Sequence, residues 1–273
     1  MSEAIETLPP DSPPPRIDVT PLLRIIVPVA LLALWWVATT LNPDSLIPPP
    51  QQVGTALWDL AFGGINDDAF SGMLLPDLLA SAERVYGAFL LAAALAVPLG
   101  MLIGRLRVIK TLLEPTLQVL RPVPVTAWLP LSMILFGIGA RSAFFLVALG
   151  SFYPILVNTI FAVRSVEPRL FEAAQMLGVS PARLFPKVVL PASLPGIFTG
   201  LRLGLGFAWV VIVVGEMTGV QTGLGAMIMD ARQLSRTEII IAGMAVIGVA
   251  GFLSDYAVTA IGRKLLAWSP QHG

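Results

Sequence analysis

Long apolar stretches that carry almost no charge constrain this sequence more than any other feature. Each is about 20 residues long, the length of α-helix that crosses the hydrocarbon core of a bilayer. Apolar and polar residues do not alternate along them as they would in a transmembrane β-barrel. The sequence therefore predicts an all-α polytopic membrane protein. We expect six transmembrane helices, at residues 22–41, 85–103, 123–140, 142–163, 194–217 and 239–262.

Composition agrees with this class and excludes several kinds of chemistry. Charged residues make up 12% of the chain, against about 25% in a typical soluble domain. There is no cysteine, and the one histidine is His272. We therefore expect no catalytic residue and no bound metal. A net charge of zero also offers no excess of positive charge to phosphate, so no nucleic-acid partner is expected.

The placement of Lys and Arg predicts the orientation in the membrane, because cytoplasmic loops are enriched in both. Residues 42–83 contain neither, whereas residues 104–121 and 164–187 contain several. The segment before the first span is acidic, unlike a cleaved signal peptide. Both termini are therefore expected in the cytoplasm. Of the 17 basic residues, all but four lie on that side; the four are Arg84, Arg141, Arg232 and Arg236.

These spans divide the chain into five expected regions. The outer loop should carry a short helix, because Val53, Ala56, Leu57, Leu60 and Ala61 recur at helical spacing. That helix either lies on the outer membrane surface or packs on the bundle. The regions are a disordered Pro-rich cytoplasmic tail (1–20), a first transmembrane helix (21–41), the outer loop (42–81), a core of five helices (82–265) with a cytoplasmic loop at 164–191, and a second cytoplasmic tail (266–273).

The cytoplasmic loop is the most distinctive segment. Pro168 suits the first turn of a helix, and Gly178 suits its end. Ser180 can cap a second helix, which Leu190-Pro191 is expected to end. On the first helix, one apolar face is expected to hold Leu170, Phe171, Ala174 and Leu177. Such a helix pair could be a simple interfacial connector.

The spacing in this loop favours a more specific interpretation. Glu172-Ala173-Ala174, three residues, Gly178, nine residues, Val188, one residue and Leu190-Pro191 resemble the E-A-A-x3-G-x9-I-x-L-P loop of bacterial ABC importer permeases. The resemblance runs from about residue 48 to residue 268 and is strongest to the nitrate/sulfonate/taurine branch. Gly215 stands where that branch more often has Ala. The other stretches that carry it are residues 46–50, 81–84, 120–130, 136–139, 152–159, 200–209, 215–217 and 223–225.

The resemblance implies the type I ABC importer permease fold in a bacterial inner membrane. It implies a homodimer of permeases, a pair of cytoplasmic ATPase subunits that bind ATP and Mg, and an extracytoplasmic substrate-binding protein. The absence of a G-x4-G-K-[ST] motif in this chain agrees with a separate ATPase. The residues expected to couple the loop to that ATPase are Glu172, Ala173, Ala174, Leu177, Gly178, Arg183, Leu190 and Pro191.

The implied function is that of the permease subunit of an ATP-driven importer of small anions that works by alternating access. The expected substrates are taurine or other sulfonates, nitrate or bicarbonate. The main alternative is an ion-coupled secondary carrier, which would need a relay of intramembrane acids, and only Asp255 lies well inside a span. A membrane-embedded enzyme would need a site for which neither cysteine nor a usable histidine is present.

Two charges interrupt the spans at equal depth. Arg202 and Asp255 each lie about seven residues from the cytoplasmic end of a span, or about 10 Å in. We expect an ion pair between them, although Arg202 could instead contact an anionic substrate or extend toward the interface. Gly196, Gly200 and Gly204 recur every four residues, a pattern of close helix contact. That contact could involve a second copy, a neighbouring helix or internal packing of the bundle.

Several further residues are candidates for the translocation path or its outer gate. Glu216 and Met217 end the fifth span at the outer side. Glu216 could also be a solvated helix end, or a partner for Arg232 or Arg236. The other candidates could instead serve as interface anchors or as interhelical hydrogen-bond donors. These are Trp128, Asn158 and Trp209.

Overall fold

The computed structural model describes residues 20–42, 45–66, 68–266 and 268. The expected N-terminal tail and most of the C-terminal tail lie outside these residues. The chain divides into two compact units, residues 1–52 and residues 53–273. The helices of the described residues are α1 (Thr20–Leu41), α2 (Pro50–Phe62), α3 (Leu74–Arg105), α4 (Arg107–Leu120), η1 (Val125–Trp128), α5 (Leu129–Phe136), α6 (Ala140–Arg164), α7 (Pro168–Met176), α8 (Pro181–Leu184), the π-helical η2 (Phe185–Val189), α9 (Leu190–Glu216), α10 (Leu224–Gln233) and α11 (Thr237–Leu265).

In the first unit, α1 coincides with the first expected span. Its described apolar part is Ile26–Leu41, which is shorter than the long spans of the second unit. The helix ends before the prolines at 48–50, and the indole of Trp35 donates a hydrogen bond of 3.2 Å to the Pro48 carbonyl. The first unit is therefore a single helix whose following loop folds back on it.

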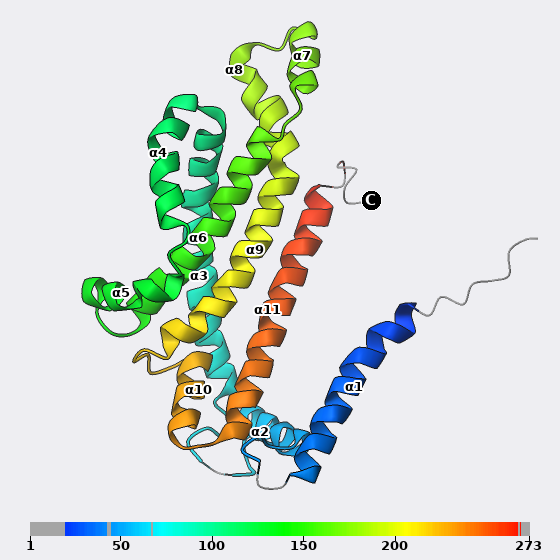
Figure 1. Ribbon diagram of the computed structural model, residues 1–273, viewed down its shortest axis with the longest axis vertical. Coiled ribbons are helices and arrows are strands. Elements are labelled where there is room, and N and C mark those ends of the chain that lie inside the picture. Colours follow the sequence, from blue (N-terminus) through cyan, green and yellow to red (C-terminus); the bar gives the residue numbers. More distant parts are fainter. Residues whose placement is uncertain (1–19, 43–44, 67, 267, 269–273) are drawn as a thin grey trace, which may run out of the picture. The chain divides into compact units, whose positions relative to one another are not determined.

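Four long apolar helices form the second unit in the described part of the chain, and they run side by side in Figure 1. They are α3, α6, the continuous helix Phe185–Glu216, and α11. These helices confirm the expected spans at 85–103, 142–163, 194–217 and 239–262. α3 begins at Leu74, so it also takes in residues that were expected in the outer loop.

The expected third span, residues 123–140, is not one continuous helix. α4 and the segment Val125–Phe136 meet at a bend of 90°. Pro122 and Pro124 cause this break, because proline lacks an N–H donor and disfavours helical backbone in the residue before it. The described residues therefore contain four long apolar spans, or five if the bent pair is one span, and the shorter apolar helix Ile26–Leu41; the expected count of six is not confirmed exactly.

α6 lies between α3 and α9, and glycines allow all three helices to approach closely. A Cβ atom at Gly204 of α9 would lie 2.6 Å from Cγ1 of Ile155, and one at Gly196 would lie 2.5 Å from Cβ of Ala162. A Cβ atom at Gly100 of α3 would lie 2.7 Å from Thr159 on the other side of α6. Gly196, Gly200 and Gly204 therefore pack inside the bundle and do not face a second copy.

Residues 53–62 of α2 present a buried apolar face within the second unit, formed by Val53, Ala56 and Leu60. The Asp59 carboxylate accepts hydrogen bonds from the backbone N–H groups of Ile65 and Asn66, at 2.9 and 3.2 Å. The Ile65 hydrogen bond is the main cause that lowers the pKa of Asp59. The stabilisation of this loop is therefore present above the ordinary carboxyl pKa and is lost as the pH falls through the lowered value.

Overpacking the contact between α6 and α9 should destabilise the protein. We expect Gly204→Val to cost about 1–3 kcal/mol, because the new side chain overlaps Ile155 and the Ser151 carbonyl. Gly248→Val is the matched control, since nothing lies within 4 Å of a Cβ atom at that exposed position inside α11. Thermal unfolding of the detergent-purified variants measures both effects, and equal losses would contradict this packing.

Candidate functional site

The cytoplasmic loop of the sequence analysis is a short helix hairpin at one end of the second unit (Figure 1). α7 begins at Pro168 and ends at Met176, and Gly178 follows in the left-handed region with φ +76°. The Gly178 N–H donates to the Gln175 carbonyl at 2.9 Å, and the Val179 N–H donates to the Ala174 carbonyl at 3.0 Å. Gly178 therefore ends α7, because it reaches positive φ without a steric penalty.

An apolar cluster fixes this hairpin to the long helices. Phe171 of α7 and Phe185 pack against the buried valines Val163, Val166 and Val189. The Arg105 guanidinium, at the end of α3, lies 5.8 Å from the centroid of the Phe171 ring, a cation–π distance. The hairpin is thus attached to the ends of α3, α6 and α9 together.

The tip of the hairpin exposes apolar side chains. Met176 is 89% exposed and Leu177 is 85% exposed, beside the exposed Glu172 and Ala173. Leu177 is the C-cap residue of α7, and of the expected apolar face only Ala174 and Phe171 are buried or partly buried. Adjacent uncovered apolar side chains of this size are typical of a protein contact surface.

The hairpin continues into α9 without a break. Leu190-Pro191 was expected to end the second helix, and the structure contradicts this. Residues 185–189 form a π-helical turn, in which the Leu190 N–H donates to the Phe185 carbonyl five residues back. This wider turn accommodates the missing N–H groups of Pro186 and Pro191. Phe185–Glu216 is therefore one helix of 32 residues, with the exposed Arg183 just before it.

A buried polar cluster lies at the other end of this long helix. The Glu216 carboxylate is 1% exposed and pairs with Arg84 of α3 at 2.6 Å. It also accepts hydrogen bonds from the Ser81 hydroxyl, at 2.8 and 2.9 Å, and from the Gly225 N–H, at 2.9 Å. Arg84 in turn donates to the Thr222 carbonyl at 2.7 Å. One carboxylate thus joins α3, α9 and the start of α10.

Glycines leave room for this cluster. A Cβ atom at Gly223 would lie 2.5 Å from the Glu216 carboxylate, and one at Gly225 would lie 2.7 Å from the Val213 carbonyl. The N–H of Gly223 donates to Asp77 at 2.8 Å, and the N–H of Leu224 donates to the Ser81 hydroxyl at 2.9 Å. The G-L-G motif therefore positions the first backbone N–H groups of α10.

The sequence left two structural alternatives for Glu216, a solvated helix end and a partner for Arg232 or Arg236, and the structure shows neither. Glu216 is buried, so it is not a solvated helix end, and its ionic partner is Arg84. Arg236 pairs with Asp68 at 2.8 Å and with Glu238 at 2.5 Å, and these contacts raise the pKa of its guanidinium. Sequence reasoning missed Arg84 because the partner lies more than 130 positions away on another helix. Met217 follows as the partly buried end of α9.

The structure also contains the ion pair expected between two spans. The Arg202 Nε and Nη2 atoms donate to the two carboxylate oxygens of Asp255, each at 2.8 Å. The two side chains are 46% and 40% exposed in the single chain. This bidentate pair joins α9 to α11 on an open face and occupies the Arg202 guanidinium.

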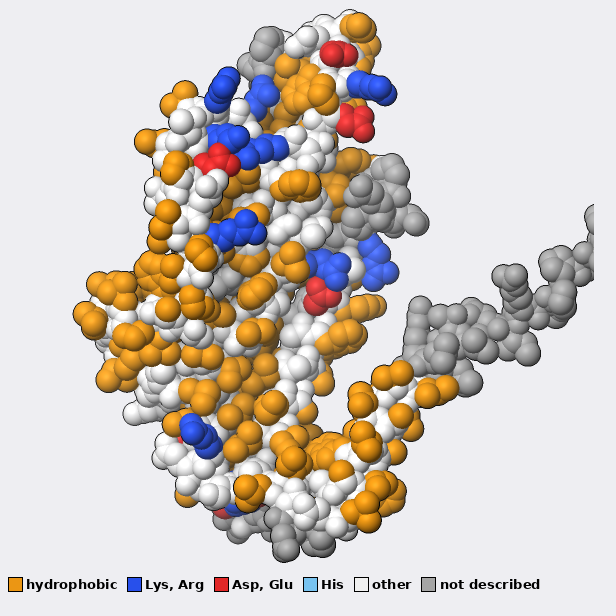
Figure 2. Space-filling model, viewed as in Figure 1, with side chains coloured by type: hydrophobic (Ala, Val, Ile, Leu, Met, Phe, Trp, Pro, Cys, Tyr) orange, Lys and Arg blue, Asp and Glu red, His pale blue; other side chains and the backbone are white. Residues whose placement is uncertain are grey.

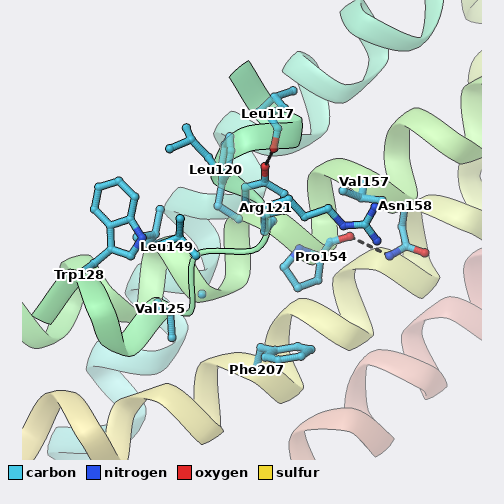
Figure 3. Close-up of a pocket in the computed structure, with 14 residues that line it drawn as sticks. Leu117, Leu120, Arg121, Val125, Trp128, Leu149, Pro154, Val157, Asn158 and Phe207 are labelled. Atoms are coloured by element: carbon cyan, nitrogen blue, oxygen red, sulfur yellow. Dashed lines mark hydrogen bonds between the residues drawn. The ribbon is translucent and has the colours of Figure 1, made fainter. Parts of the chain in front are cut away.

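Two of the three path candidates line one cavity. Trp128 and Asn158 lie on a cavity of about 490 Å³ between α4, α6 and α9, together with Arg121, Tyr153 and Phe207 (Figure 3). Trp209 lies elsewhere: it is 3% exposed, and its indole N–H donates to the Ser254 hydroxyl at 2.9 Å. The described residues contain no group of three or more His, Cys, Asp or Glu placed to hold a metal.

Removing the Glu216 charge should substantially lower the free energy of unfolding. Glu216→Gln leaves Arg84 without its ionic partner, and breaking a buried pair costs about 3 kcal/mol or more. Glu114→Gln is the control, because its contacts with Lys110 and Arg164 are 3.5–3.6 Å long and about one-third exposed. Glu114→Gln should lower the free energy of unfolding by less than about 1 kcal/mol. Thermal unfolding in detergent measures both, and similar losses would rule out a buried role for Glu216.

The Arg202–Asp255 pair should appear as coupling in a double-mutant cycle. Asp255→Asn and Arg202→Gln each leave one charge unpaired, whereas the double variant leaves none. Both side chains are nearly half exposed, so screening limits the coupling to about 1 kcal/mol. Thermal unfolding of the four proteins measures it. Strictly additive effects would mean that the pair does not stabilise the fold.

Comparison with known proteins agrees with this arrangement. The chain is 38% identical to the taurine transport system permease protein TauC of Escherichia coli, over 87% of this chain and 86% of the relative. It is 32% identical to the nitrate import permease protein NrtB of Synechocystis, over 86% of each chain. A chain of the MetNI methionine ABC transporter, solved in inward-facing conformations, has a similar fold, with a TM-score of 0.61 at 18% identity over 70% of this chain and 95% of that chain.

Residues 96–267 match the family described as the binding-protein-dependent transport system inner membrane component. The match spans more than half of the chain and includes the hairpin, the long helix, and Glu216 and Gly225 of the polar cluster. The chain therefore belongs to this family and has the type I ABC importer permease fold.

Proposed function

We propose that this chain is the membrane-spanning subunit of an ATP-driven importer of small anions, with taurine and other sulfonates as the first class to test and nitrate or bicarbonate as the second. The relatives that transport taurine and nitrate support this range of substrates. The ATP and Mg belong to a pair of cytoplasmic ATPase subunits, and this chain makes and breaks no bond. An extracytoplasmic binding protein delivers the anion.

One observation carries the proposal: an exposed apolar tip is joined by a continuous helix to the opposite end of the molecule. Met176 and Leu177 have no cover in this chain, and Phe185–Glu216 starts at the base of their hairpin. A partner that binds the tip can therefore displace a helix that ends in the Glu216 cluster. This linkage is what alternating access driven by a separate ATPase requires.

Charge supports the orientation of the importer. Lys and Arg gather toward the end of the second unit that carries α7 and α8, as Figure 2 shows, and this is the side expected in the cytoplasm. The α10 end then faces outward, toward the binding protein. The last turn of α11 carries Arg263 and Lys264, which supports assigning this end of the helix to the cytoplasmic side. The N-terminus is assigned to the same side.

An exposed face of α9 supports a homodimer. Leu203, Phe207 and Val210 follow one another along this face and are 48–67% exposed, with Gly206 between them. A side chain is absent at Gly206, so another helix can approach closely there. We assign this face to contact with a second copy and to the pathway between the two copies.

Charge introduced at the hairpin tip should release the ATPase without unfolding the chain. We expect Leu177→Asp to reduce the ATPase subunit that co-purifies with the complex at least tenfold, because the exposed apolar contact is replaced by a charge. Leu234→Asp is the matched control, since Leu234 is 64% exposed at the opposite end of the molecule. It should retain the ATPase. Full ATPase recovery with Leu177→Asp would overturn the docking assignment.

The complex purified with its ATPase also distinguishes an ATP-driven importer from an ion-coupled carrier. Liposomes that contain the full complex should take up taurine only when ATP is supplied to the ATPase side. Uptake by the isolated chain along a proton or sodium gradient would support the carrier and contradict the proposal.

A further inference from the structure

The cavity between α4, α6 and α9 contains an arginine that the structure leaves without an ionic partner. Arg121 follows the last residue of α4, and its side chain extends toward Asn158 of α6 in Figure 3. In the described part of the chain, no carboxylate forms an ion pair with it, whereas Arg84 and Arg202 each have one. The guanidinium is therefore available to an anion from outside this chain.

The end of α4 that carries Arg121 is anchored to α6. The Tyr153 hydroxyl donates to the Leu117 carbonyl, which ties the last turn of α4 to α6. Pro122 then breaks the chain direction directly after Arg121. Since α4 is 14 residues long, its end lies about 20 Å along the helix from the turn after α3. An unpaired cation at such depth in a membrane protein marks a candidate substrate path.

A second hydrogen-bond donor lies beside Arg121. The Asn158 Nδ2 atom donates to the Pro154 carbonyl at 2.8 Å, and a carboxamide NH₂ group has a second N–H to offer. Gly200 of α9 leaves room for this side chain, because a Cβ atom at 200 would lie 2.8 Å from Asn158 Cβ. A guanidinium and an amide N–H on one wall suit the several oxygens of a sulfonate group.

The remaining walls are apolar and aromatic. They include Trp128, Leu149, Phe207 and Leu120. The cavity of about 490 Å³ falls within the roughly 300–1,000 Å³ of small-molecule sites, which bind mostly through apolar contact. A bare nitrate ion would leave these walls unused, whereas a molecule with an aliphatic body would cover them.

The cavity borders the exposed face of α9. Phe207 lines both the cavity and the neighbouring groove that holds Arg202, Gly206 and Asp255. That face is the one assigned above to the second copy and the pathway. Arg202 is already neutralised there by Asp255, so Arg121 is the better candidate to attract a passing anion.

We propose that Arg121 and Asn158 bind the sulfonate group of the transported molecule in this cavity, while Trp128 and Phe207 contact its aliphatic body. This inference rests on the proposed function and deepens it, because it makes the permease itself selective for organosulfonates over inorganic anions. The same guanidinium chemistry would also suit the phosphate of a lipid headgroup, and the experiment distinguishes the two sources.

The test is ATP-dependent uptake by the full complex, with its ATPase and binding protein, in liposomes of phosphatidylcholine alone. Hexane-1-sulfonate and nitrate are the two probes. We expect Arg121→Gln to slow hexane-1-sulfonate uptake at least tenfold and Arg121→Lys to keep part of the rate, because Lys retains the charge without the bidentate geometry. Trp128→Ala should lower the ratio of hexane-1-sulfonate to nitrate uptake at least threefold.

Arg107→Gln is the matched control, since Arg107 is an exposed arginine at the other end of α4. It should transport as the wild type does. An Arg121→Gln complex that keeps its ATPase and imports hexane-1-sulfonate at the wild-type rate would overturn the inference and leave the proposed function standing. A wild-type complex that imports none of hexane-1-sulfonate, taurine, nitrate and bicarbonate with ATP would overturn the proposed function itself.

The lipid alternative has its own result. Suppose that Arg121→Gln transports normally in phosphatidylcholine and is less thermally stable than the wild type only when phosphatidylglycerol is present. Arg121 then binds a headgroup, and the inference is wrong. A loss of uptake in phosphatidylcholine alone supports the substrate assignment, because those liposomes contain no anionic lipid.

Discussion

The continuous helix from Phe185 to Glu216 is the constraint on which the rest of the structure depends. Its first turn is π-helical and carries the hairpin that ends in Met176 and Leu177. Its last residue is the buried carboxylate that joins α3, α9 and α10. Because a packed helix moves as a rigid body, a displacement at one end is transmitted to the other end. Chemistry in a separate ATPase can therefore reach the outer end of this chain.

The close packing of α6 makes that transmission effective. Glycines on α9 and α3 meet the two sides of α6, with side chains such as Ile155 and Thr159 against their backbones. Contacts this close resist bending and favour displacement of the helices together. The exposed face of α9 stays free of this packing, and we propose that a second copy and the pathway meet there.

Much of this could be predicted from the sequence, for identifiable reasons. Hydropathy located four long helices, and the E-A-A spacing located the hairpin and its Gly178 turn. Equal depth correctly predicted the pair of Arg202 and Asp255, since their helices, α9 and α11, are in contact. The third span failed because average hydropathy does not register the break at Pro122 and Pro124. For Glu216, a candidate for the path or gate, the only ionic partners considered were Arg232 and Arg236, because local spacing cannot reveal a partner on α3.

Pro186 and Pro191, near the hairpin, show a similar limit of reasoning from sequence. Pro191 is typical of a helix end, yet a π-helical turn accommodates it, and the resulting continuity links the hairpin to α9.

The most direct test of the account is the number of anions imported per ATP hydrolysed after two glycines are inserted between Val189 and Leu190. The account predicts that ATP hydrolysis persists while import per ATP falls at least tenfold. An unchanged ratio would contradict transmission through this helix.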